Sequence, residues 1–144
     1  MKWQYKETNS FEQRLKMSSI LKKNYPDLLP VIVEKFENAS IPDIEKRRFL
    51  APKDISVGQF IWIVRHRIKL EPEKAMFLFI NKMVPSSTAK FREIYEEHQD
   101  EDGFLYVAYS GESTFGTSPA AADTVAVSLW DSATRVIPAY ALFS

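Results

Sequence analysis

The sequence predicts an α+β fold of the β-grasp kind, in which one helix crosses a four-stranded mixed sheet. Two capping boxes, Ser10-Phe-Glu-Gln13 and Ser56-Val-Gly-Gln59, mark the beginnings of two helices. Two short runs with strand character precede the second helix and two follow it. This order indicates a hairpin, a crossover helix and a strand that returns to the same sheet.

The first helix is expected to begin after Ser10 and to end before Pro26, because proline lacks an amide donor and crowds the preceding turn. A modest apolar stripe is expected along it, formed by Phe11, Leu15, Ser18 and Leu21 or Lys22. The basic residues of this helix lie mostly off the stripe, so we expect most of them to face water.

The next two elements are predicted to be strands. Leu28-Leu-Pro-Val-Ile-Val33 is apolar and rich in β-branched residues, which favours a buried strand. Residues 38–43 supply turn chemistry. Arg48-Phe-Leu-Ala-Pro52 then predicts a second strand at an edge of the sheet, because its proline cannot donate to a ladder.

The crossover helix has the strongest helical spacing in the chain, in the positions Val57, Phe60, Ile61, Val64 and Ile68. The segment Met76-Phe-Leu-Phe-Ile80 follows it and predicts a third strand. Because this strand is apolar on both faces, we expect both to be covered.

A short helix and a last strand complete the predicted domain. Residues 86–88 are expected to cap the helix, which carries Phe91, Ile94 and Tyr95. Asp102-Gly103 then turns the chain into the last strand, from Phe104 to Tyr109.

The charges balance over the whole chain but not along it. A chain of 144 residues with no net charge fits one domain and has no general attraction for nucleic acid. Up to Tyr25 there are six basic residues and two acidic ones, whereas residues 93–112 contain seven acidic residues and no Lys or Arg. This asymmetry indicates either charged docking faces or an ordinary solvated surface.

Several classes of function are disfavoured by what the chain lacks. It has no cysteine, so disulfides, thiolate catalysis and cysteine metal sites are excluded. The N-terminus lacks the apolar core of a signal peptide, and no apolar run approaches the ~20 residues of a membrane span. We therefore expect a soluble protein as synthesised. His66 and His98 lie in no nucleophile or metal-ligand motif, so neither an enzyme nor a metal site is expected.

Seven segments spread over the chain share a pattern with one known family. They are Phe11-Glu-Gln-Arg, Lys23-Asn-Tyr-Pro-Asp27, Pro30-Val-Ile-Val-Glu-Lys35, Phe49-Leu-Ala-Pro52, Val57-Gly-Gln-Phe60, Arg65-His-Arg67 and Asp102-Gly-Phe-Leu-Tyr106. Together they resemble the autophagy ubiquitin-like modifiers of the GABARAP and light-chain-three type. The similarity covers Met1 to Gly116 almost without gaps.

The resemblance implies a ubiquitin-like domain over residues 1–116, in which residues 1–25 form an extension of two N-terminal helices. It also implies that a cysteine protease cuts between Gly116 and Thr117, with Phe115 as an apolar handle. Activating and conjugating enzymes then pass Gly116 to phosphatidylethanolamine for autophagosome formation and transport to the vacuole or lysosome. No cofactor is implied besides this covalent lipid. The expected protein is a monomer in the cytoplasm and, once lipidated, on the autophagosome membrane.

Residues 117–144 are the largest departure from the family's pattern. Their only charged residues are Asp123, Asp131 and Arg135, although 26% of the whole chain is charged. A propeptide that is cut away is the main interpretation. Docking of this extension over a peptide groove, and an isoform that is never processed, stay open.

Members of the family bind aromatic-x-x-aliphatic motifs of cargo receptors by adding them as a strand at the sheet edge. The resemblance assigns the pocket for the aromatic residue to Leu21, Pro30, Ile32, Leu50 and Phe104. It assigns the pocket for the aliphatic residue to Phe49, Ala51, Pro52, Ile55, Phe60 and Ile63. Acidic residues around the motif would meet Lys46, Arg48 and Arg67. We expect Ile32 and Phe60 to belong to the core, and Phe49 and Leu50 to be exposed on their edge strand.

Two alternatives keep the fold and change the function. In the first, the chain is an adaptor that binds the same peptides but is never cut or lipidated. In the second, the basic N-terminal helix binds tubulin or RNA, in which case binding should weaken steeply with salt.

Overall fold

The computed structural model describes residues 1–37 and 39–112, and these form a four-stranded sheet with four helices. The strands are β1 (Leu28–Lys35), β2 (Arg48–Pro52), β3 (Phe77–Phe79) and β4 (Leu105–Ser110), in the order β2-β1-β4-β3. The two central strands, β1 and β4, are parallel and the outer pairs are antiparallel. This mixed sheet confirms the predicted fold class.

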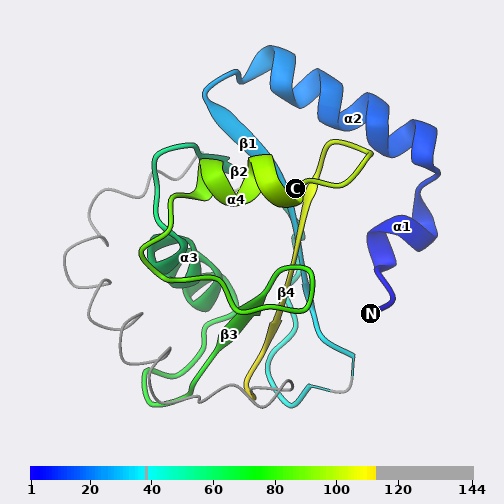
Figure 1. The fold of residues 1–144 in the computed structure, drawn as a ribbon. Coiled ribbons are helices and arrows are strands. Elements are labelled where there is room, and N and C mark those ends of the chain that lie inside the picture. Colours follow the sequence, from blue (N-terminus) through cyan, green and yellow to red (C-terminus); the bar gives the residue numbers. More distant parts are fainter. Residues whose placement is uncertain (38, 113–144) are drawn as a thin grey trace.

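The helices cover the two faces of the sheet (Figure 1). On one face lie α3 (Val57–Arg67) and α4 (Phe91–His98), which supply apolar side chains to the main core. The N-terminal helices α1 (Gln4–Thr8) and α2 (Phe11–Asn24) lie on the other face and contribute to a second apolar cluster. The sheet therefore has an apolar cluster on each face to which β2 contributes, and a third, smaller cluster contains Phe77, Phe79 and Ala108.

Several predicted boundaries are confirmed. Both capping boxes are formed, by Ser10 with Gln13 and by Ser56 with Gln59. The strand β2 has its predicted bounds and lies at an edge of the sheet, whereas β3 is shorter than predicted. The turn before β4 requires glycine, because Gly103 has a φ of +89° and a Cβ there would lie 2.4 Å from the hydroxyl oxygen of Ser18.

The predicted cap of α4 is wrong. This helix begins at Phe91, and its N-cap residue, Lys90, makes no side-chain capping bond. Instead, the amide of Phe91 donates to the carbonyl of Ile55 at 2.8 Å, and that of Arg92 donates to the carbonyl of Lys53 at 3.2 Å. The loop after β2 thus satisfies the first helical amides, which no local sequence pattern reveals.

The predicted apolar stripe of α2 is wrong in its first half. Phe11 and Leu15 are 43% and 40% exposed, whereas Ser18 and Leu21 are buried. The helix is rotated so that Arg14 also points inward, with 11% of its side chain exposed. A polar network explains this rotation, as described below.

Candidate functional site

The outer edge of β2 is the place where the resemblance predicts peptide binding. In the described part of the chain β2 pairs only with β1, so its other edge has no strand beside it. Successive side chains of a strand point to opposite faces, and both faces of β2 are flanked by apolar clusters. A peptide added here would meet one cluster on each side, which is the arrangement that two pockets require.

The residues predicted for the aromatic pocket come together between α2 and the sheet. Leu21, Ile32, Leu50 and Phe104 belong to one cluster, and Pro30 lies opposite Leu50 in the β1–β2 register. The expected exposure of Leu50 is wrong, because only 1% of this residue is exposed. The helix α2 brings Leu21 into the same cluster, so α2 forms one wall of this predicted pocket.

The residues predicted for the aliphatic pocket lie on the α3 side. Phe49, Ala51, Ile55, Phe60 and Ile63 all belong to the main core, and Pro52 is half-buried. The expected exposure of Phe49 is also wrong, because it packs edge-on against Phe60 with 5.7 Å between ring centroids. The core positions predicted for Phe60 and, in the other cluster, Ile32 are confirmed.

The three basic residues predicted to flank the groove differ in exposure. Lys46 is exposed, whereas Arg48 and Arg67 are half-buried. Arg48 lies close to Tyr5: burial raises the pKa of this tyrosine, and a hydrogen bond and the charge of Arg48 oppose the rise. Arg65 has a structural role, because its guanidinium donates to the carbonyls of residues 71, 72 and 74.

A buried carboxylate joins the N-terminal helices to the rest of the domain. Asp102 is fully buried, and its Oδ2 accepts from Arg14 Nη1 at 2.6 Å and from the Tyr106 hydroxyl at 2.5 Å. Its Oδ1 accepts from the amide of Phe104 at 2.9 Å, and its carbonyl accepts from the Ser18 hydroxyl at 2.5 Å. We call this set the Asp102 network.

Two tyrosines, Tyr106 of this network and Tyr95 beside it, stay protonated over the physiological range. Burial, together with the hydrogen bond to Asp102, raises the pKa of Tyr106 far above its ordinary value. Burial and the charge of Asp102 raise the pKa of Tyr95 to about 12, and its hydroxyl donates to the carbonyl of Gly103 at 2.6 Å. Both hydroxyls are therefore permanent donors at neutral pH.

The asymmetric charges of the chain are partly paired with each other. Lys6 bonds to Asp100 at 2.8 Å, and Arg14 bonds to Asp102. Burial opposes ionisation of Asp100, but the hydrogen bond from Lys6 and its other donors outweigh this and hold the pKa of the carboxyl below its usual value. Some of the predicted docking charges therefore hold α1 and α2 in place.

Glu34 is a second buried carboxylate with a structural role, and sequence reasoning missed it. Its oxygens accept from the amides of Gln4 at 2.8 Å and Tyr5 at 2.9 Å, and Arg47 lies at 3.3 Å. Because α1 has no side-chain cap of its own, Glu34 caps it from β1. An acidic residue directly after the apolar run Leu28–Val33 was the available signal for such a partner.

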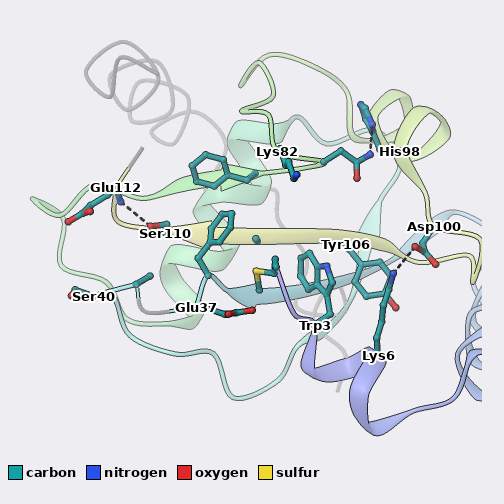
Figure 2. A pocket seen from close by; sticks show the side chains of 16 residues that line it. Trp3, Lys6, Glu37, Ser40, Lys82, His98, Asp100, Tyr106, Ser110 and Glu112 are labelled. Atoms are coloured by element: carbon teal, nitrogen blue, oxygen red, sulfur yellow. Dashed lines mark hydrogen bonds and ion pairs between the residues drawn. The ribbon is translucent and has the colours of Figure 1, made fainter. Parts of the chain in front are cut away.

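A cavity of about 570 Å³ lies on the same face as α1 but over β4 and β3, away from the β2 edge (Figure 2). We call it the sheet-face cavity, and its lining includes Trp3, Lys6, Phe36, Phe79, Tyr106 and Ala108. Figure 2 shows Lys6 and Asp100 at one end and Ser110 and Glu112 at the other. No motif in the sequence predicted this cavity, because its lining comes from five separate segments of the chain.

The described residues contain no group of three His, Asp or Glu side chains that could hold a metal ion. His66 is exposed and stacks on Trp62 with 4.6 Å between ring centroids.

Within residues 1–37 and 39–112, no helix is long and apolar enough to cross a membrane. The predicted cleavage site, Phe115 to Thr117, lies outside the described residues and begins five positions beyond the end of β4 at Ser110.

Comparison with known proteins gives one consistent result. The family model described as "Autophagy protein Atg8 ubiquitin like" matches residues 13–116. Autophagy-related protein 8 of Mycosarcoma maydis is 50% identical over 116 residues, which are 81% of this chain and 98% of that relative. Autophagy-related protein 8d of Arabidopsis thaliana is 49% identical over 112 residues, 78% of this chain and 93% of the relative.

Solved structures agree with these sequence matches. A crystal structure of Trypanosoma brucei ATG8 has a TM-score of 0.76 and 42% identity, and the match covers 81% of this chain and all of that one. Plasmodium falciparum Atg8, solved in complex with an Atg3 peptide from the same organism, has a TM-score of 0.72 and 34% identity. That match covers 78% of this chain and 98% of the Plasmodium chain.

Proposed function

This chain belongs to the Atg8 family of ubiquitin-like autophagy proteins, and we propose that it is trimmed to Gly116 and then joined to phosphatidylethanolamine. Proteins of this family are ubiquitin-like modifiers and not themselves enzymes. In this proposal residues 1–116 are the modifier domain and residues 117–144 are a propeptide.

The observation that carries the proposal is where the family match ends. It ends at residue 116, which is the glycine, although 28 residues follow (144 − 116). The pairwise match with the Mycosarcoma relative covers 98% of that protein. That relative therefore has no segment that corresponds to the 28 residues after Gly116. The extension therefore stands outside the part of the chain that the family shares.

Glycine suits this position for a physical reason. Its carboxylate would pass through narrow channels of a protease and of transfer enzymes, first as an acyl-adenylate and then as a thioester. A residue without a Cβ fits such channels and adopts backbone angles that other residues avoid. The strand β4, which is buried along its length, would hold the base of the reactive arm in place.

Lipid attachment would change where the protein resides. Each buried methylene contributes about 0.8 kcal/mol, and a single myristoyl chain anchors only marginally. Phosphatidylethanolamine has two acyl chains, so the conjugate would stay on the autophagosome membrane while the free protein stays in the cytoplasm. No other cofactor is proposed.

The proposed partners are a processing cysteine protease, the activating and conjugating enzymes, and cargo receptors with aromatic-x-x-aliphatic motifs. The Atg3 peptide bound to the Plasmodium relative supports a conjugation-enzyme partner. The unpaired edge of β2, with an apolar cluster on each face, supports strand addition of a peptide. Because Leu50 and Phe49 are buried, binding would require α2 and α3 to move slightly away from β2.

Tail removal and lipid transfer can be tested on the purified 144-residue chain. We expect the family's processing protease to remove residues 117–144, and the activating and conjugating enzymes then to add one phosphatidylethanolamine, both visible by intact mass. The product should float with liposomes. A chain that keeps its full mass and gains no lipid would instead be an unlipidated adaptor.

Lys46→Glu should weaken binding of a peptide that has acidic residues before its aromatic-x-x-aliphatic core. Lys46 is exposed and lies two positions before β2, so we expect a loss of about 0.2–1 kcal/mol for each acidic neighbour. The measurement is a peptide titration by fluorescence polarisation. The loss should shrink as salt is added.

Lys82→Glu is the matched control, because Lys82 is also exposed but follows β3 at the opposite edge of the sheet. It should leave the dissociation constant unchanged. If Lys46→Glu and Lys82→Glu weakened peptide binding equally, the peptide would not bind at the β2 edge.

A further inference from the structure

We propose that two copies of this chain associate through the outward face of α2, with the two helices antiparallel. This face consists of Glu12, Leu15, Ser19 and Lys22, and we call it the α2 seam. All four residues are exposed, on the side of the helix that points away from the buried Ser18 and Leu21. Their spacing of three, four and three positions is typical of a seam between two packed helices.

The domain leaves two large apolar side chains of α2 in contact with water. Phe11 and Leu15 are 43% and 40% exposed, although the sequence predicts both in a buried stripe. The bond from Arg14 to Asp102 turns the arginine inward, and these two side chains then lie outward. Figure 1 shows α2 at the periphery of the domain, so its outer side is open to a second molecule. Such a molecule would cover apolar surface that the fold itself does not cover.

A two-fold axis level with Met17 makes the α2 seam self-complementary. Two antiparallel helices related by this axis place Glu12 opposite Lys22 of the second copy, and Leu15 opposite Ser19 of the second copy. Each contact then occurs twice, because a two-fold interface uses the same surface on both molecules. The antiparallel direction also sets the N-terminus of each helix beside the C-terminus of the other, where the helix dipoles attract.

The outer layers of this pair are charge-complementary. Within residues 1–37 and 39–112, neither Glu12 nor Lys22 forms an ion pair. Lys22 is exposed, and its Nζ lies 5.4 Å from the centre of the Tyr95 ring. A parallel pair would set Glu12 against Glu12 and Lys22 against Lys22. The charges therefore favour the antiparallel pair and disfavour the parallel one.

The central layers allow the two helices to approach closely. Ser19 has a small side chain, and its hydroxyl already donates to the carbonyl of Leu15 at 2.8 Å. Burying Ser19 under Leu15 of the second copy therefore leaves no unsatisfied donor. At each flank Phe11 comes opposite Lys23 of the second copy, whose methylene stem would cover part of the ring. Both exposed apolar side chains of α2 thus gain a neighbour.

The contact is small, so we expect weak association in dilute solution. The helix has 14 residues, whereas stable interfaces bury about 800 Å² on each partner. Copies held on one membrane are concentrated, and there the α2 seam would join neighbours; this consequence rests on the proposed lipid attachment at Gly116. The seam would stay accessible, because Gly103 lies beside Ser18 of α2 and the arm leaves from the other end of β4, at Ser110. Association in solution needs no lipid, so the two proposals fail separately.

Charge reversal tests this register in the full 144-residue chain. Glu12→Lys alone and Lys22→Glu alone each set like charges opposite one another, so each should lower the association constant about tenfold or more. An equal mixture of the two variants should restore association, because every outer layer of the mixed pair again joins opposite charges. Sedimentation equilibrium over a series of protein concentrations measures the association constants, and circular dichroism checks that each variant is folded.

Glu93→Lys and Lys82→Glu are the matched controls, because they make the same charge changes at exposed positions outside α2. Each should associate as the original chain does, alone and in the mixture. Three results would overturn the proposal. The first is an original chain that stays monomeric up to about 1 mM. The second is equal association of the original chain and the two α2 variants. The third is a mixture of folded Glu12→Lys and Lys22→Glu chains that associates no better than either chain alone.

Discussion

Gly116→Ala is expected to slow tail removal and lipid transfer by on the order of 100-fold each while leaving the fold unchanged. The added methyl group must fit into channels shaped for a residue without a side chain. Displacing the reacting carbonyl by about 1 Å is enough to cost a factor of this size. Intact mass after timed incubation measures tail removal, and the lipid-shifted fraction measures transfer from a chain synthesised to end at residue 116.

The chain offers a matched control in Gly111→Ala, the same change five positions earlier. A Cβ at Gly111 would meet its nearest neighbours at 3.7–3.9 Å, which is ordinary contact, and its backbone is not left-handed. Both reactions should therefore proceed at the original rate. If Gly116→Ala is processed as fast as the original chain, the reactive residue lies elsewhere, and the mass of the released fragment identifies it.

Local patterns predicted those elements whose determinants lie close together in the sequence. The capping boxes at Ser10 and Ser56 placed the beginnings of α2 and α3, because a capping box satisfies helix amides within four residues. Pro52 placed β2 at an edge, since it has no amide to donate. The resemblance assigned five residues to the aromatic pocket, and four of them lie in one apolar cluster of the structure.

The failures share a cause, which is that the deciding partner lies far away in the chain. The start of α4 is held by carbonyls of Lys53 and Ile55, 36 or more positions before the helix. Leu50 is buried in one apolar cluster with Leu21 of α2, so the edge position of β2 did not imply exposure. The rotation of α2 that exposes Phe11 follows from a carboxylate 88 positions after Arg14.

The basic N-terminus shows the same effect in its charges. Six basic residues up to Tyr25 suggested a face for an external partner. Two of them, Lys6 and Arg14, instead bond to Asp100 and Asp102 of the acidic segment. Tubulin or RNA binding through this helix would have to rely on the remaining charges.

Asp102→Ala is expected to lower the free energy of unfolding by about 3–5 kcal/mol, the usual cost of removing one partner from a buried ion pair. It would leave the Arg14 guanidinium, 11% exposed, without its carboxylate, and the Tyr106 hydroxyl and the Phe104 amide without their acceptors. Since small domains are stable by only about 5–15 kcal/mol, this is a large share of the total. Urea unfolding monitored by circular dichroism measures the change.

Glu101→Ala is the control, because this neighbouring acidic residue is exposed and should change stability by less than about 0.5 kcal/mol. Asp102→Asn separates charge from shape, since the amide keeps one oxygen but leaves Arg14 without a negative partner. We expect the free energy of unfolding of Asp102→Asn to fall between those of the other two variants. Its amide hydrogens should exchange faster in α2 than in α3. If Asp102→Ala unfolds at the same urea concentration as the original chain, the network does not hold the N-terminal helices. The inward rotation of α2 would then have to come from Leu21 and its apolar neighbours alone.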